Sequence, residues 1–274
     1  MAVVVMRPNI YRPGPPLADF VDCFWHWDRY AAPAPKERAL PSGTIDLIIS
    51  LDDVSGPGIP IIEVRTRWFD EALLRADQNG ARQFVILAAG MDARAYRLAW
   101  SAGVRLFEID QPDVLASKER ALASAAVRCG RRSVAIDLGD DWPRALEAAA
   151  FDRSEPTTWL IGGLLQYLDA PAVAQLFARI DALSSAGSRL LYDVVGQRLL
   201  EAPQLAHALR YMRELGAPWR FGSDEPLALL ASPPWRGQVV DPAAIGNAWQ
   251  RWPFPAQPLS IPQPRGYLIE ANKA

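Results

Sequence analysis

The sequence predicts an α/β fold, with a mostly parallel sheet of seven strands and helices on both faces. Residues 84–113 read as a strand, a turn of small residues, a short helix and a second strand, which is the order of a βαβ unit. Bounded apolar runs alternate with capped or amphipathic helical patterns along the rest of residues 61–274. Half of the 274 residues are hydrophobic, which is enough for one large α/β domain with a short appendage.

Composition excludes several classes of partner. The formal charge is −2, with 29 basic and 31 acidic residues well mixed, so no face for nucleic acid or membrane is predicted. Cys23 and Cys129 are far apart and lack the spacing of a metal site. No apolar run reaches membrane-spanning length, and the first residues lack the pattern of a signal peptide. We therefore expect a cytoplasmic protein with no metal, nucleic-acid or membrane partner.

The elements follow in chain order from local pattern. Residues 62–76 place Val64, Leu73 and Ala76 at helical spacing, and Asp169 with Pro171 mark the start of a later helix. Residues 253–264 carry five prolines and should form an extended loop. The predicted helices span residues 62–76, 113–126, 169–183 and 201–215, and the predicted strands span residues 84–87, 104–109, 133–136, 158–161, 188–193, 237–240 and 267–270.

The first βαβ unit contains the features of a nucleotide site. Ala88, Ala89 and Gly90 form a small-residue turn after the first strand, and Asp110 ends the second strand about twenty residues later. Such a turn lets the backbone approach a ligand, and the carboxylate can accept both hydroxyls of a ribose. Taken alone, the pattern is equally consistent with an ordinary crossover, because Gly90 is the only glycine of the turn.

Two longer motifs carry a family resemblance. AAGMDARAYRL and LFEIDQPDVLASKERAL resemble the class I S-adenosylmethionine-dependent methyltransferases of the leucine carboxyl methyltransferase and polyketide O-methyltransferase group. The resemblance continues, with interruptions, from Val64 to the C-terminus. It implies a Rossmann-like methyltransferase domain over residues 61–274. It also implies methyl transfer from S-adenosylmethionine to a hydroxyl or carboxylate oxygen of a small molecule, with a polyketide-like acceptor as one candidate.

The resemblance also assigns roles to individual residues. It implies that Arg65 grips the carboxylate of the cofactor, with Arg67 as the alternative, because a planar guanidinium suits a carboxylate. It implies that Asp137 and Leu138 meet the adenine, and that Gln166 and Tyr167 lie near the transferred methyl group. The implied cofactor-binding set is Arg65, Ala88, Ala89, Gly90, Asp110, Gln111, Asp137, Leu138 and Gly162.

Two departures from the family pattern keep other functions open. Ala88 stands where the family favours glycine, and Gly162 stands where it usually has an acid. A weakly active enzyme, or a degenerate methyltransferase fold that serves as a ligand-binding or regulatory protein, is therefore the second hypothesis. A dinucleotide-dependent oxidoreductase is a third and poorer one, because the turn lacks the GxGxxG glycines.

The N-terminal residues 1–55 belong to a different pattern. RPNIYRPGPPLADFVDCFWHWDRY and ERALPSG resemble the opening of the sensory domain of AraC-type transcriptional regulators. In this segment Trp25 and Trp27 alternate with polar residues as in a half-buried strand, and a second strand is expected over residues 45–51. Residues 54–60 read as a linker. We expect the aromatic strands to pack on the methyltransferase domain or across a homodimer interface, because a short hairpin alone is marginal in water.

Overall fold

The computed structural model describes residues 8–11, 24–27, 61–214, 216–230 and 234–274. The expected strand at residues 45–51 and the linker at residues 54–60 lie outside these ranges. Trp25 and Trp27 lie in a strand, as predicted. The elements are β1 Pro8–Tyr11, β2 Phe24–Trp27, α1 Ile61–Gln78, β3 Gln83–Leu87, α2 Arg94–Arg97, β4 Arg105–Asp110, α3 Pro112–Ala121, β5 Gly130–Ala135, α4 Trp142–Ala148, β6 Thr157–Ile161, η3 Leu165–Tyr167, α5 Ala170–Leu183, β7 Arg189–Val195, α6 Gln197–Leu200, η4 Pro203–Leu205, α7 Ala206–Glu214, η5 Pro226–Leu229, β8 Trp235–Val240, α8 Pro242–Ala248 and β9 Gly266–Lys273.

The main sheet has seven strands in the order β5-β4-β3-β6-β7-β9-β8. All pairs are parallel except those of β9, which runs antiparallel to both β7 and β8. The chain builds outward from β3 through β4 to β5 and then returns to place β6 on the other side of β3. The strand order therefore reverses at β3, and a ligand crevice is expected beyond the carboxyl end of this strand.

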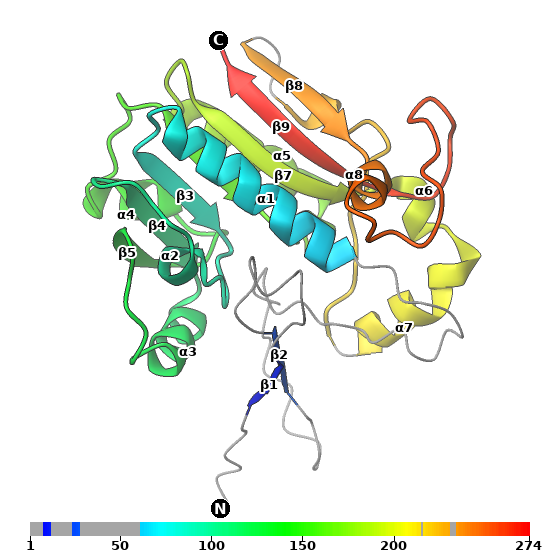
Figure 1. Cartoon of the computed structure of the whole chain (residues 1–274), viewed down its shortest axis with the longest axis horizontal. Coiled ribbons are helices and arrows are strands. Elements are labelled where there is room, and N and C mark those ends of the chain that lie inside the picture. Colours follow the sequence, from blue (N-terminus) through cyan, green and yellow to red (C-terminus); the bar gives the residue numbers. More distant parts are fainter. Residues whose placement is uncertain (1–7, 12–23, 28–60, 215, 231–233) are drawn as a thin grey trace, which may run out of the picture.

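Successive side chains of the strands point to opposite faces of the sheet and contribute to two separate hydrophobic layers. Phe84 and Ile86 of β3 face α1 and α2, where they join Phe69 and Trp100. Figure 1 shows α1 lying diagonally across this face of the sheet. The strictly buried pattern of β3 explains why the sequence shows it as a continuous apolar run, as expected for a central parallel strand.

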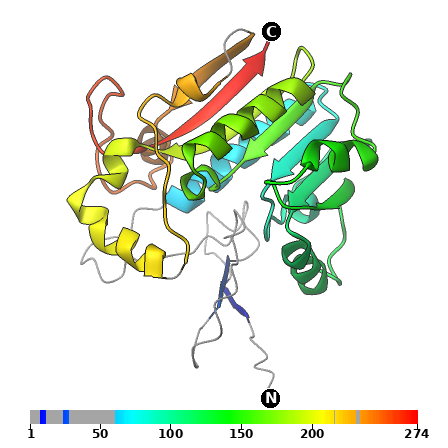
Figure 2. The ribbon, with the colours of Figure 1, turned by 180° about the vertical axis from the view of Figure 1, so that it is seen from behind.

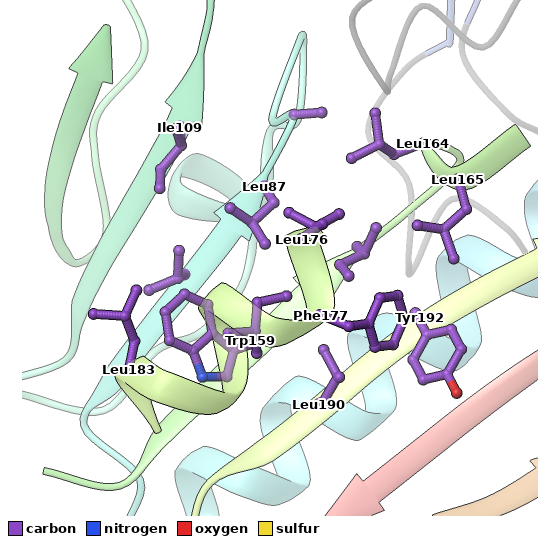
Figure 3. Packing of buried hydrophobic residues seen from close by; sticks show 14 of the residues in the cluster. Leu87, Ile109, Trp159, Leu164, Leu165, Leu176, Phe177, Leu183, Leu190 and Tyr192 are labelled. Atoms are coloured by element: carbon purple, nitrogen blue, oxygen red, sulfur yellow. The ribbon is translucent and has the colours of Figure 1, made fainter. Parts of the chain in front are cut away.

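The opposite layer packs under α4 and α5. Figure 2, seen from behind, shows α5 crossing this face of the sheet. Phe177 of α5 packs edge-to-face on Tyr192 of β7, with ring centroids 5.1 Å apart. Figure 3 shows Leu87, Leu176 and Trp159 pointing into the same layer. The two layers fix the carboxyl ends of β3, β4 and β6 relative to each other.

Several predicted boundaries are wrong. The helix predicted at residues 113–126 ends at Ala121. The helix predicted at residues 201–215 is broken into η4 and α7, and Pro203 starts the 3-10 turn. Helix α8 was not predicted, although Asp241 caps it by accepting a bond from the Ala243 N–H and Pro242 fills its first turn.

Candidate active site

The turn after β3 has the backbone conformation that glycine favours. Ala88 has φ of 51° and Gly90 has φ of 44°, so both residues lie in the left-handed region. A non-glycine residue in this region carries a steric cost of about 1–2 kcal/mol. The turn therefore keeps the geometry of a glycine-rich loop while placing a methyl group at residue 88.

Asp110 ties the end of β4 to this turn. Its Oδ2 atom accepts a hydrogen bond from the Gly90 N–H at 2.7 Å, and its Oδ1 atom accepts one from the Gln111 N–H at 2.7 Å. The residue is 5% exposed, and burial raises the pKa of its carboxyl group even though the two backbone donors act in the opposite direction. Each oxygen keeps a second lone-pair direction, so the carboxylate can still accept bonds from a ligand.

Gln111 and Asp137 meet across the ends of β4 and β5. The Gln111 Nε2 atom donates to Asp137 Oδ2 at 2.7 Å, and Asp137 Oδ1 accepts from the Gly139 N–H at 2.7 Å. Arg179 of α5 donates to the carbonyl oxygens of Leu138 at 3.1 Å and Asp140 at 2.7 Å. The loop that follows β5 is therefore held by Gln111 on one side and by Arg179 on the other.

Arg65 and Arg67 lie in different surroundings on α1. Arg65 Nη1 pairs with Asp193 Oδ2 at 3.1 Å, and Asp193 Oδ1 accepts from the Gly163 N–H at 2.6 Å. Arg67 instead donates to Glu71 at 2.9 Å and stacks over the ring of Trp249. Arg65 is thus the arginine of α1 that reaches the ends of β6 and β7, next to the crevice beyond the carboxyl end of β3.

A cavity opens at the carboxyl ends of β3 and β6, next to α1. Gly162 has room for a side chain, because a Cβ atom there would lie 3.6 Å from the ring of Phe69. In contrast, Gly163 has φ of 67°, and its Cβ would lie 2.8 Å from Arg65 Nη1. Three residues of the predicted cofactor-binding set line this cavity: Arg65, Ala88 and Gly162, together with Thr66, Phe69, Ile86, Leu87, Asp92, Arg94 and Leu160.

Asp92 and Arg94 form a buried ionic cluster in the wall of the cavity. Arg94 pairs with Asp92 and with Asp70, the latter at 2.7 Å. Burial alone would raise the pKa of the Asp92 carboxyl group, but the pKa lies below its ordinary value, chiefly because the positive charge of Arg94 is so near. Asp92 Oδ1 also accepts from the Arg94 N–H at 2.7 Å, just before α2 begins. Arg94 is 7% exposed, so the guanidinium is buried together with the two acids that it pairs with.

Gln166 and Tyr167 lie on η3, directly after the cavity. The Gln166 Nε2 atom donates to the Gly163 carbonyl oxygen at 3.0 Å, and the main-chain oxygen of Gln166 accepts from the Arg220 N–H at 2.6 Å. The ring of Tyr167 meets the ring of Trp219 edge-on, with centroids 6.4 Å apart. The segment from residue 219 therefore runs against η3.

Asp193, Arg179 and Trp219 are site residues that the sequence analysis did not single out. Asp193 had a usable signal, because it ends the strand predicted at residues 188–193 just as Asp110 ends β4. Arg179 had no local signal, since only the tertiary fold brings it to the loop after β5. Trp219 begins the segment WRFGSDEP, which resembles a signature of the same family, but the segment alone does not place it against η3. Within the described part of the chain there is no cluster of three or more His, Cys, Asp or Glu residues that could hold a metal ion. No described helix is long and apolar enough to cross a membrane.

Comparisons with known proteins agree with this architecture. The family model described as leucine carboxyl methyltransferase matches residues 57–181. Among solved structures, a DUF574 family protein from Streptomyces avermitilis has a TM-score of 0.55 at 16% identity, covering 78% of this chain and 86% of that one. A protein from Thermobifida fusca whose structure is described as that of a "putative methyltransferase" has a TM-score of 0.52 at 20% identity, covering 82% and 87%. These two likenesses show the class I methyltransferase fold.

Curated relatives extend the match beyond the family model. A "Putative S-adenosyl-L-methionine-dependent methyltransferase" of Parafrankia sp. (strain EAN1pec) is 39% identical over 217 residues, which are 78% of this chain and 68% of that protein. A relative with the same description from Mycolicibacterium smegmatis is 42% identical over 214 residues, covering 75% and 67%. A second M. smegmatis relative is 52% identical over 141 residues, only 47% of its length. The chain belongs to the leucine carboxyl methyltransferase family of S-adenosyl-L-methionine-dependent methyltransferases.

Proposed function

We propose that this methyltransferase transfers a methyl group from S-adenosylmethionine to an oxygen atom, hydroxyl or carboxylate, of a small molecule. The observation that carries the cofactor site is the pair of bonds from Gly90 N–H and Gln111 N–H to Asp110. They hold one carboxylate at the end of β4, beside a left-handed turn. When bound, the cofactor would supply an electrophilic methyl group on its sulfonium. The acceptor oxygen would bond to that methyl carbon while the C–S electron pair goes to sulfur, so S-adenosylhomocysteine would be the leaving group.

The residues of the crevice fit the three chemical parts of this cofactor. Asp110 is a carboxylate with open lone-pair directions, which suits a ribose diol. Asp137 and the Leu138 N–H offer an acceptor and a donor, which suits an adenine edge. Arg65 offers a guanidinium for the carboxylate of the methionine part, while Ala88, Ala89 and Gly90 bring backbone close to it. The wall of the cavity leaves room at Gly162, because a Cβ there would only reach ordinary contact with Phe69.

The protein part of catalysis is then alignment and exclusion of water. Gln166 and Tyr167 border the acceptor side on η3, and Trp219 covers the ring of Tyr167. A polyketide-like acceptor fits the family resemblance. A homodimer is one arrangement that would cover the aromatic strands of the N-terminal segment.

A pair of titrations tests this proposal against the dinucleotide alternative. We expect calorimetry to give 1:1 binding of S-adenosylhomocysteine and no heat of binding for NAD⁺. The protein is then incubated with S-adenosylmethionine and a panel of hydroxyl and carboxyl acceptors. Mass spectrometry should detect products in which a methyl group replaces one hydrogen atom of the acceptor. Binding of NAD⁺ in preference to S-adenosylhomocysteine would overturn the proposal.

A further inference from the structure

Asp193 ties the guanidinium of Arg65 to the end of the sheet. Strands β6 and β7 are parallel neighbours, and Ile161 pairs with Tyr192, so the loop after β6 begins beside Asp193. The Asp193 carboxylate uses one oxygen for each side of this junction: Oδ1 accepts from the Gly163 N–H at 2.6 Å, and Oδ2 lies 3.1 Å from Arg65 Nη1. One acid therefore holds both the backbone of this loop and an arginine that lines the cavity.

Gly163 completes the seat of this guanidinium. Its φ is 67°, and a Cβ atom there would lie 2.8 Å from Arg65 Nη1, so a side chain at residue 163 would displace the arginine. The side chains of Arg65 and Asp193 are only 12% and 15% exposed. Water therefore screens this pair less than it screens a surface ion pair, whose contribution is usually small. The pair is suited to hold the guanidinium in one position at the edge of the cavity.

A held guanidinium favours ligand binding. A long arginine side chain loses conformational freedom when it binds a ligand, and less of that cost remains when the side chain is already ordered. A guanidinium has five N–H donors in one plane, so it can bind a second carboxylate while it keeps the first. Helix α1 itself is held from its other side, because Arg94 pairs with Asp70 of this helix at 2.7 Å. Asp193 adds the position of the guanidinium.

We propose that Asp193 is a positioning residue, which holds Arg65 ready for the α-carboxylate of the methionine part of S-adenosylmethionine. This role rests on the function proposed above and adds to the cofactor site a residue that need not touch the cofactor. Asp193 should then contribute to the affinity for a ligand with an α-carboxylate and not to that for a ligand without one. Its charge repels the α-carboxylate and attracts the neighbouring α-ammonium, so its direct effects on this zwitterion oppose each other and the effect through Arg65 prevails.

Two ligands that differ in the amino acid part test this role. S-adenosylhomocysteine carries the α-carboxylate and the α-ammonium, whereas 5′-methylthioadenosine keeps the adenosine and the sulfur and lacks both charged groups. Calorimetry measures the dissociation constant of each ligand for the parent and for Asp193→Asn. The amide keeps an oxygen as acceptor for the Gly163 N–H but loses the charge that pairs with Arg65. We expect S-adenosylhomocysteine to bind this variant about twofold to tenfold more weakly and 5′-methylthioadenosine to bind as it does to the parent.

A double-mutant cycle shows whether Asp193 acts through Arg65. Arg65→Met removes the guanidinium, so adding Asp193→Asn to that variant should change the affinity for S-adenosylhomocysteine no further. Glu270→Gln is the matched control, because Glu270 of β9 pairs at 3.0 Å with Arg75, in the last turn of the same helix and away from the cavity. It should bind both ligands as the parent does. Asp193→Ser, which keeps a hydroxyl near the Gly163 N–H, is a second variant and should show the same selective loss.

The outcomes separate the role of Asp193 from the cofactor site. If Asp193→Asn weakens both ligands equally, weakens neither, or still weakens S-adenosylhomocysteine in the Arg65→Met background, Asp193 does not position Arg65 and the cofactor site stands. Failure of both Asp193 variants to fold would make this acid a structural residue and would also overturn the proposal. If the parent itself does not bind S-adenosylhomocysteine, the proposed function is wrong and the role of Asp193 falls with it.

Discussion

Replacing Ala88 by glycine tests whether the methyl group of the turn touches the cofactor. The left-handed φ of 51° costs an alanine about 1–2 kcal/mol that glycine would not pay. Two effects oppose this gain: the larger freedom of glycine in the unfolded chain, about 0.5–1 kcal/mol, and the loss of a buried methyl group, about 0.8 kcal/mol. The terms nearly cancel, so we expect the free energy of unfolding to change by less than about 1 kcal/mol.

Cofactor affinity should respond more clearly than stability. Ala88 lines the cavity, and an excess methyl group in a tightly packed site typically costs at least about 1 kcal/mol. We therefore expect Ala88→Gly to bind S-adenosylhomocysteine about fivefold to tenfold more tightly by calorimetry.

Ala150→Gly is the control for this experiment. Ala150 has φ of 65° but is exposed after α4, so no methyl burial is lost. It should gain about 0.5–1 kcal/mol of stability in urea unfolding and leave cofactor affinity unchanged. An unchanged dissociation constant in Ala88→Gly would show that the methyl group of Ala88 does not face the ligand.

Three further predictions address the cavity wall, a buried ion pair and a thiol. Gly162→Glu should fold and bind S-adenosylhomocysteine more tightly. Gly163→Ala should lose both stability and affinity, because Gly163, unlike Gly162, combines a positive φ with a clash at Arg65. Equal effects of the two variants would contradict this prediction. Lys118→Met should cost more than about 1 kcal/mol in urea unfolding, because Lys118 and Glu108 are fully buried 2.7 Å apart, although Glu108 keeps Arg131 at 2.8 Å. Arg153→Ala at the exposed pair with Glu147 should cost at most about 1 kcal/mol. Burial raises the pKa of the Cys129 thiol to about 12, so in a Cys23→Ser background alkylation at pH 8 should be slow, speed up about tenfold per pH unit, and become fast in denaturant; fast labelling of the native protein at pH 8 would count against the burial.

The sequence was sufficient for the elements whose signals are local. The apolar run of β3, the small-residue turn and the acid that ends β4 are each encoded within a few residues. Asp169 likewise caps α5 as predicted, by accepting from the Ala172 N–H at 2.9 Å. In these places local propensity and the final fold agree, so the type of each element followed from pattern alone.

Contacts between residues that are distant in the sequence could not be predicted from local pattern. The order of the strands brings Asp193 of β7 to Arg65 of α1, 128 residues apart. It also brings Arg179 of α5 to the loop after β5. No local pattern predicts either pairing, because each of these side chains is an ordinary polar residue in its own segment. Pro203 lies inside the helix predicted at residues 201–215, and the 3-10 turn that replaces the start of that helix begins at this residue.

Asp110 is the residue that we propose holds the ribose of the cofactor, and calorimetric titration of Asp110→Ala with S-adenosylhomocysteine measures its contribution. Asp113→Ala is the matched control, an exposed acid three residues further along in α3. The loss of a charged acceptor should weaken binding by about 1–3 kcal/mol, or about fivefold to 150-fold, while Asp113→Ala should bind as the parent does. A folded Asp110→Ala protein with the parent's dissociation constant would contradict the account.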